Sequence, residues 1–182
     1  DIAQAVALQR SLGPWKNLSD VFPYHKADST WAINTTELDL SPDVRLKNIF
    51  GYNRTKSDDG YDFDASPFPY FEIHGDLLPS GKMDPVAGYA LKTRQISDEL
   101  QLQGKAFDNR LDYVLGFYYL DQKFSVVSND QFWNFSSPAF RFIYTAKTKT
   151  RSVAGFAQAT YKLTDKLNLT GGVRYTWDKT TM

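Results

Sequence analysis

The chain has 182 residues, of which 42% are hydrophobic and 15% aromatic, so it is long and apolar enough for one folded domain or part of a larger one. Its 21 Lys and Arg balance its 21 Asp and Glu, and a formal net charge of zero gives no general attraction for nucleic acid. The absence of cysteine excludes disulfide scaffolds, thiol catalysis, zinc–thiolate sites and iron–sulfur clusters.

Hydropathy excludes a membrane helix but not a membrane barrel. The longest uncharged apolar run, Tyr113–Leu120, is far shorter than the about 20 residues that a transmembrane helix needs. A transmembrane β-strand needs only about 9–11 residues and a single apolar face. The class of membrane protein left open by the sequence is therefore the β-barrel.

Alternating apolar and polar side chains predict β-strands along most of the chain, after a short helix at Asp1–Arg10. In chain order the strands are expected at Trp31–Leu40, Val44–Arg54, Gln95–Gly104, Arg110–Leu120, Ser152–Lys162 and Lys166–Asp178. In the first and fifth of these the apolar residues change face, which a β-bulge could absorb.

The connections between these strands alternate between short and long. Turn residues make tight connections at 41–43, 107–109 and 164–166, whereas 1–29, 57–89 and 125–148 read as long polar–aromatic loops. Hairpins whose tight turns all lie at one end are typical of transmembrane barrels, which have short periplasmic turns and long extracellular loops.

Aromatic residues recur at a constant distance from the tight turns. Tyr52, Tyr119 and Tyr175 lie ten or eleven positions from Pro42, Asp108 and Asp165, respectively. Ten residues of a strand tilted by about 40° climb about 25 Å, the height of the apolar band of a membrane barrel. A soluble β-sandwich is also rich in aromatics, but the repeated spacing favours the membrane. The predicted lipid-facing set is Leu46, Phe50, Tyr52, Leu111, Tyr113, Leu115, Phe117, Leu167, Leu169, Val173 and Tyr175, and Asp98 is the main departure from an apolar lipid face.

Three stretches, 95–103, 112–119 and 156–176, resemble the barrel of TonB-dependent outer-membrane receptors. The most specific part is Phe156-Ala157-Gln158-Ala159-Thr160-Tyr161, followed by a short turn and Gly172-Val173-Arg174-Tyr175. The resemblance covers roughly residues 30–178. It implies an all-β fold, an antiparallel transmembrane β-barrel segment of about six strands in hairpins.

The same resemblance implies a function, a location and partners. Such receptors lie in the bacterial outer membrane, in contact with its lipid, and import a scarce ligand such as an iron chelate, cobalamin or a carbohydrate. The TonB complex supplies energy through a plug domain, and the full barrel has about 22 strands. Because only about six strands and no plug motif are found, we interpret residues 1–182 as a partial barrel domain, an internal segment of a receptor. No nucleic acid is expected as a partner.

Candidate site residues fall into a capture group and a route group. The aromatic segments of two long loops provide Tyr70, Phe71, Trp133 and Phe135, which suit capture of an exposed ligand. Gln101, Gln103 and Arg174, together with Glu99, occupy the polar faces of strands, where they would line the route of the ligand. The alternative for the aromatic segments is loop packing, and for the charged side chains it is pairing with neighbouring strands or a plug.

The sequence supports no catalytic, cofactor or firm metal site. No nucleophile elbow, phosphate loop or zinc motif occurs, so we expect no enzyme and no cofactor. The acidic stretch Asp58–Asp64 is either an ion site or a solvated loop base, and His25 and His74 are expected to be surface residues without nearby partners. Two other functions stay open: a small complete outer-membrane barrel with a structural or adhesive role, and a soluble carbohydrate-binding β-domain.

Overall fold

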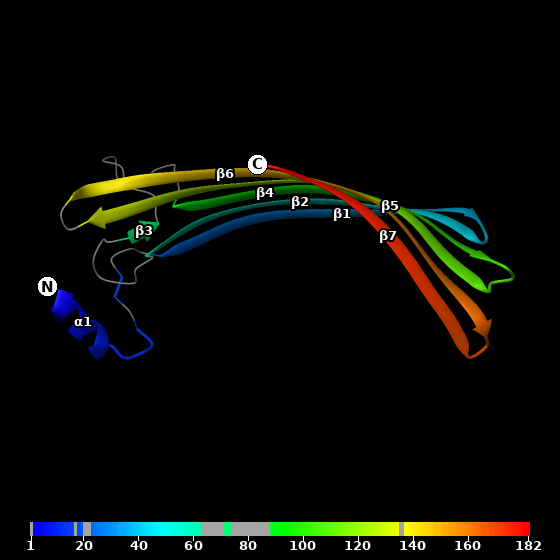
Figure 1. Cartoon of the computed structure of the whole chain (residues 1–182), viewed down its shortest axis with the longest axis horizontal. Coiled ribbons are helices and arrows are strands. Elements are labelled where there is room, and N and C mark those ends of the chain that lie inside the picture. Colours follow the sequence, from blue (N-terminus) through cyan, green and yellow to red (C-terminus); the bar gives the residue numbers. More distant parts are fainter. Residues whose placement is uncertain (1, 17, 20–22, 63–70, 74–87, 135–136) are drawn as a thin grey trace. The chain divides into compact units, whose positions relative to one another are not determined.

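The computed structural model describes residues 2–16, 18–19, 23–62, 71–73, 88–134 and 137–182. Within these ranges a short helix precedes a set of long strands (Figure 1). The elements are α1 (Ile2–Ser11), β1 (Tyr24–Ser41), β2 (Val44–Asp62), β3 (Phe71–Ile73), β4 (Tyr89–Ala106), β5 (Leu111–Asn134), β6 (Ser137–Thr164) and β7 (Leu167–Thr181). No helix in the described part of the chain combines the length and the apolar character needed to cross a membrane.

The residues divide into two compact units, which we describe separately. Unit 1 comprises 1–28, 55–92 and 125–147, and unit 2 comprises 29–54, 93–124 and 148–182. The strands follow the order β1-β2-β3-β5-β6-β7, and β4 pairs with β2 and β5. The all-β class is therefore confirmed, and all six strands expected from the sequence are present.

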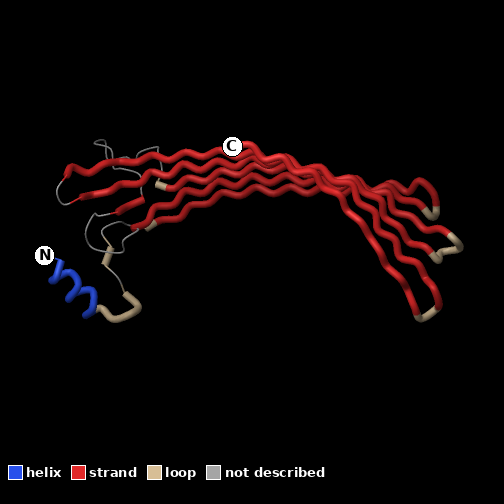
Figure 2. Tube along the Cα trace, viewed as in Figure 1, coloured by secondary structure: helices blue, strands red, loops and turns tan. Residues whose placement is uncertain are grey.

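In unit 2 the three tight turns gather at one end of the strands (Figure 2). Hydroxyl side chains stabilise two of them, because Ser41 and Thr164 accept hydrogen bonds from the amides of Asp43 and Lys166, both at 3.3 Å. The third turn places Phe107, Asp108 and Asn109 at φ values of 55°, 55° and 61°. Asp and Asn tolerate this left-handed conformation better than most residues, which suits Asp108 and Asn109 to two of the three positions.

The cross-strand register of β6 and β7 assigns the side chains of unit 2 to two faces. Val153 lies opposite Trp177, and Ala157 lies opposite Val173. Because successive side chains of a strand alternate, these pairs share one face, and Phe156 opposite Arg174 lies on the other. We call the first the apolar face and the second the polar face.

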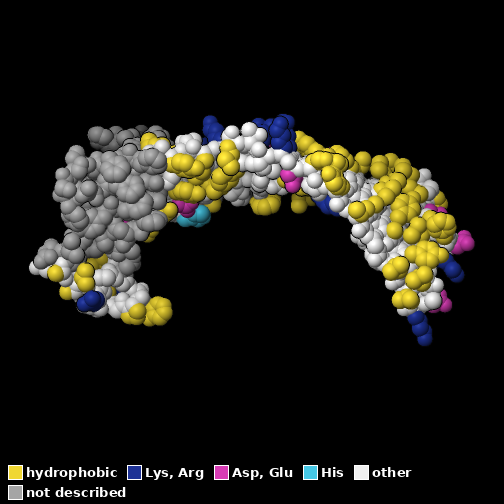
Figure 3. Space-filling model, viewed as in Figure 1, with side chains coloured by type: hydrophobic (Ala, Val, Ile, Leu, Met, Phe, Trp, Pro, Cys, Tyr) yellow, Lys and Arg dark blue, Asp and Glu magenta, His cyan; other side chains and the backbone are white. Residues whose placement is uncertain are grey.

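Large hydrophobic side chains stay exposed on the apolar face. Exposure reaches 48% for Leu115, 51% for Phe117, 70% for Val173 and 61% for Tyr175, all members of the set expected to face lipid. Figure 3 shows hydrophobic side chains gathered over the strands near the tight turns. Asp98, the departure noted in the sequence, accepts a hydrogen bond from Asn48 at 2.5 Å, so its carboxylate has a polar partner on this face. A contiguous exposed apolar surface marks contact with a membrane or another protein.

The prediction of long loops was wrong for several segments, because the strands extend well beyond the ten or so residues expected. β5 continues to Asn134 and β6 begins at Ser137, where a loop was expected over 125–148. β2 continues to Asp62, and β1 already begins at Tyr24. Within unit 1, Val126 and Ser128 are only 7% exposed. Polar and aromatic residues that suggested loops here form strands because the neighbouring strand pairs their backbone groups.

The pairing of β6 with β7 shows no β-bulge within 152–162, where one was expected. The register of β6 against β7 is regular from Lys149 to Lys162, and its shift lies between Lys162 and Thr164. Phe156 therefore belongs to the polar face, where its ring covers Gly116 of β5, since a Cβ there would lie 2.0 Å from the ring. The Arg174 guanidinium lies over the same ring at 5.8 Å. Packing against a glycine and a cation, rather than a bulge, accommodates the phenylalanine.

The Phe156–Gly116 contact gives a test of this packing. The Gly116→Ala substitution forces the Phe156 ring off its site and should lower the free energy of unfolding by about 1–3 kcal/mol. Gly155→Ala is the matched control in β6, because a Cβ at Gly155 would meet nothing within 4 Å. Unfolding followed by circular dichroism measures the stability of both variants. Equal stability of the two variants would contradict the packing described.

Candidate functional site

Paired charges on the hairpin of β1 and β2 begin the polar face of unit 2. Arg45 donates from Nε to Asp39 at 2.7 Å and from Nη1 to Glu37 at 2.9 Å. Lys47 Nζ lies 2.9 Å from the other oxygen of Glu37. Exposed ion pairs contribute little stability individually, but a network of four groups restricts the orientation of each. The face therefore presents ordered charge of both signs.

A row of amides continues this face on β4. Gln103 donates from Nε2 to Oε1 of Gln101 at 2.7 Å, and Gln101 in turn donates to Glu99. Side chains two positions apart share a face of a strand, so the three groups form a ladder along β4. Gln95 accepts a hydrogen bond from Gln122 of β5 at 3.4 Å. Two members of the ladder, Gln101 and Gln103, are predicted route residues. Their amides can offer hydrogen-bond donors and acceptors to a polar solute.

Arg174 of β7 lies over two aromatic rings. Its guanidinium carbon lies 5.2 Å from the centre of the Tyr118 ring and 5.8 Å from that of Phe156. Nε also donates to the hydroxyl of Thr176 at 3.1 Å. A cation over a ring is attracted by the electrons of its face, and the terminal N–H groups of the guanidinium remain as donors. A polar or anionic group passing along this face would meet these donors.

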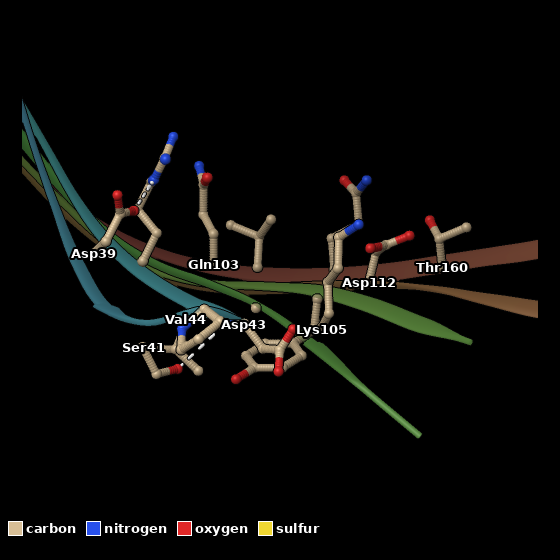
Figure 4. Close-up of a pocket in the computed structure, with 14 residues that line it drawn as sticks. Asp39, Ser41, Asp43, Val44, Gln103, Lys105, Asp112 and Thr160 are labelled. Carbon is tan, nitrogen blue, oxygen red and sulfur yellow. Dashed lines mark hydrogen bonds and ion pairs between the residues drawn. The ribbon is translucent and has the colours of Figure 1, made fainter. Parts of the chain in front are cut away.

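A pocket of about 350 Å³ opens where the tight-turn ends of five strands meet. In Figure 4 the side chains of Asp39, Gln103, Asp112 and Thr160 project to the same side of the sheet. The lining of the pocket also includes Asp43 and the cations Arg45 and Lys105. Of the predicted route residues, Gln103 lies in this pocket, whereas Gln101 and Arg174 are not among its lining residues.

Sequence reasoning did not find the acidic lining of this pocket. Asp39 and Asp112 lie on separate strands, and each taken by itself in the sequence is interpreted as a solvated side chain. Only the register of the hairpins brings them onto one surface. In the sequence both residues alternate with apolar neighbours. This pattern indicates that they lie on the polar face of a strand, but it does not indicate a pocket.

In unit 1 the predicted capture segments meet in the backbone pairing. Phe71 of β3 lies opposite Phe132 of β5 in an antiparallel register, and Trp133 follows directly in β5. Two of the four capture residues, Tyr70 and Phe135, lie outside the described residues. The pairing of β3 with β5 thus joins aromatic segments that are distant in the sequence (Figure 1).

The acidic stretch in unit 1 engages side chains of β1. Asp58 accepts a hydrogen bond from the hydroxyl of Tyr24 at 3.2 Å, and Asp59 pairs with His25 Nδ1. The expectation that His25 has no nearby partner was therefore wrong, because β1 begins earlier than predicted and runs beside β2. No group of three or more His, Cys, Asp or Glu suited to a metal ion occurs among the residues that are described. His74 and Asp64 lie outside them.

Comparison with known proteins gives one clear result. No curated protein matches the sequence. The family model described as "TonB dependent receptor-like, beta-barrel" matches residues 5–181, which include every strand of both units. The exposed apolar face, the charged opposite face and this match agree. The chain belongs to the TonB-dependent receptor β-barrel family.

Proposed function

We propose that the chain forms part of the wall of a bacterial outer-membrane barrel that imports a scarce ligand, with energy from the TonB complex. The observation that carries this proposal is the division of unit 2 into an exposed apolar face and a charged polar face. Lipid would cover the first, and the second would line the interior. Membership of the family supports the role of an outer-membrane receptor.

The edges of the sheet support a larger barrel. Among the described strands, the pairing order ends at β1 and β7, and β7 is exposed along its whole length. Unpaired edges are costly in a membrane, because lipid offers no hydrogen bonds to backbone groups. We therefore propose that further strands of the receptor flank β1 and β7. A plug domain outside residues 1–182 would then couple the barrel to TonB.

For the ligand we propose an iron chelate, cobalamin or a carbohydrate, captured by Tyr70, Phe71, Trp133 and Phe135. Aromatic rings stack on sugar rings and on the apolar parts of large ligands. Arg174, Gln101 and Gln103 would line the route across the polar face. The guanidinium and the amide ladder support this assignment, since both present donors along one surface.

The membrane assignment predicts unequal effects of one substitution on the two faces. Leu115→Arg places a charge near mid-depth on the apolar face and should cost about 2–4 kcal/mol of folding free energy in lipid. Asn168→Arg, on the polar side of β7 beside a tight turn, should be nearly silent. Refolding of the receptor into lipid vesicles, scored by heat-resistant migration, measures both. Equal effects at the two positions would contradict the membrane assignment.

The ligand assignment predicts that substitutions in the capture group weaken ligand binding, whereas substitutions in the route group slow uptake. Trp133→Ala should weaken ligand binding about tenfold or more, because the stacking surface is lost. Trp15→Ala is the matched control, since Trp15 is 93% exposed in the N-terminal segment and belongs to neither group. Arg174→Gln should leave binding unchanged and slow TonB-dependent uptake.

The measurement uses the full-length receptor in cells with and without TonB. Iron chelates, cobalamin and oligosaccharides are screened first for TonB-dependent uptake, and the imported compound is then used in binding assays. If uptake of every compound is independent of TonB, the transport function is contradicted. If Trp133→Ala binds the imported compound as tightly as Trp15→Ala does, the aromatic segment only packs.

A further inference from the structure

A cluster of basic side chains lies on the apolar face of unit 2, at the strand ends away from the tight turns. Arg151 lies directly opposite Lys179, two positions beyond the pair Val153 and Trp177. Asp121 of β5 accepts a hydrogen bond from Arg151 Nε at 3.0 Å and lies 3.4 Å from Lys149 Nζ. These contacts place all four charged side chains on the face that carries Trp177.

Two other contacts extend the cluster across the sheet. On the polar face, Gln122 of β5 meets Gln95 of β4, so the adjacent residues Lys123 and Arg94 lie opposite each other on the apolar face. By the same counting from the Asp121–Arg151 pair, Lys123 lies opposite Lys149.

The last member of the cluster comes from β2. A Cβ at Gly51 would lie 2.7 Å from the hydroxyl of Ser97, which aligns β2 with β4 at this height. Counting three positions along each antiparallel strand brings Arg54 opposite Arg94. Arg54, Arg94, Lys123 and Lys149 therefore form a row across four neighbouring strands, with Arg151 and Lys179 beside it. These six side chains are the basic patch.

The basic patch carries uncompensated charge. Adjacent strands are about 4.8 Å apart, so the row of four cations spans only about 14 Å. Like charges directly opposite each other destabilise a sheet. Among the residues that the structure describes, Asp121 is the one acidic side chain in this cluster, where it accepts the hydrogen bond from Arg151. Since the whole chain has a net charge of zero, this excess of about five positive charges is segregated on one surface.

The position of the patch indicates what neutralises it. Tyr175 and Trp177 lie next to it on the same face, with ring centres 4.2 Å apart and planes at 67°. Exposed Tyr and Trp of membrane proteins gather at the boundary between the apolar band and the headgroups. Two residues further along a tilted strand rise about 5 Å, into the headgroup region. Figure 3 shows Lys and Arg side chains gathered beyond the hydrophobic surface.

We propose that the basic patch binds phosphate-bearing headgroups of membrane lipids and so fixes the depth of the barrel in an anionic leaflet. This inference rests on the proposed membrane function. The patch faces away from Arg174 and the amide ladder, so it does not serve the transported ligand. Charge complementarity at headgroup height supports a lipid rather than a protein as the occupant.

The test compares two triple variants of the receptor that contains this chain, in neutral detergent. In the first, Arg94→Gln, Lys123→Gln and Lys149→Gln remove three charges. In the second, the matched control, Arg94→Lys, Lys123→Arg and Lys149→Arg keep them. Binding of phosphatidylglycerol and of zwitterionic phosphatidylcholine is titrated and followed by native mass spectrometry, and inorganic phosphate is added as a competitor.

The wild type and the charge-preserving variant should bind phosphatidylglycerol in preference to phosphatidylcholine. The neutral variant should lose about a hundredfold in affinity for phosphatidylglycerol, since each basic residue at an anionic surface strengthens binding about fivefold. Raising the salt concentration should weaken the binding to the wild type, which tests the patch even if the neutral variant does not fold.

Three results would overturn the inference: equal affinity for the two lipids, unchanged affinity of the neutral variant, or displacement of the lipid by millimolar phosphate, which would indicate a site for free anions. Insertion of the wild type into bilayers is scored separately. Failure to insert contradicts the proposed function. Insertion without a preference for the anionic lipid contradicts only the basic patch.

Discussion

The strand register is the constraint on which the two faces, the polar site and the membrane assignment all depend. Successive side chains of a strand point to opposite faces, so a slip of one residue would exchange the faces of a whole strand. In unit 2 the tight turns and the unbroken register of β6 and β7 from Lys149 to Lys162 prevent such a slip. Phe156 shows the strength of this constraint, because it stays on the polar face and is covered by Arg174 rather than moved by a bulge.

Each face then acquires its own chemistry. The polar face joins an amide ladder on β4, ion pairs of β1 and β2, and a guanidinium that lies over the Tyr118 ring. The apolar face keeps Leu115, Phe117 and Val173 exposed, with Tyr175 and Trp177 at its end and the basic patch beyond them. A lipid environment explains this order along the strand, from apolar band to aromatic ring to cation.

The sequence predicted the strands near the tight turns well, because alternation over ten residues is a strong and local signal. The match of β7 with the segment expected at 166–178 is an example. The sequence-based prediction failed at the strand ends away from the tight turns. There β5 and β6 continue through residues whose polar and aromatic composition resembles that of a loop. At its far end β5 pairs with β3, where Phe132 lies opposite Phe71, and no local pattern encodes a partner so distant in the sequence.

The same limit applies to the candidate site. Gln101 and Gln103 could be found from one strand, because two-residue spacing already places them on one face. The pocket that contains Asp39 and Asp112 could not be predicted from the sequence, because its residues come from different hairpins that are aligned only by the strand register. The contact of Arg174 with the rings of Tyr118 and Phe156 depends in the same way on three strands.

The most direct test of the central claim is the environment of alternate residues along β5 in the membrane. The chain contains no cysteine, so single spin labels can be placed at Leu115 and Phe117 and, on the other face, at Asp112 and Val114. Their relaxation by oxygen, which partitions into lipid, is compared with that by a water-soluble nickel chelate in the receptor reconstituted into bilayers. We expect oxygen to dominate at Leu115 and Phe117 and the nickel chelate at Asp112 and Val114. Equal accessibility on the two faces would contradict the assignment of a lipid-facing and a water-facing side.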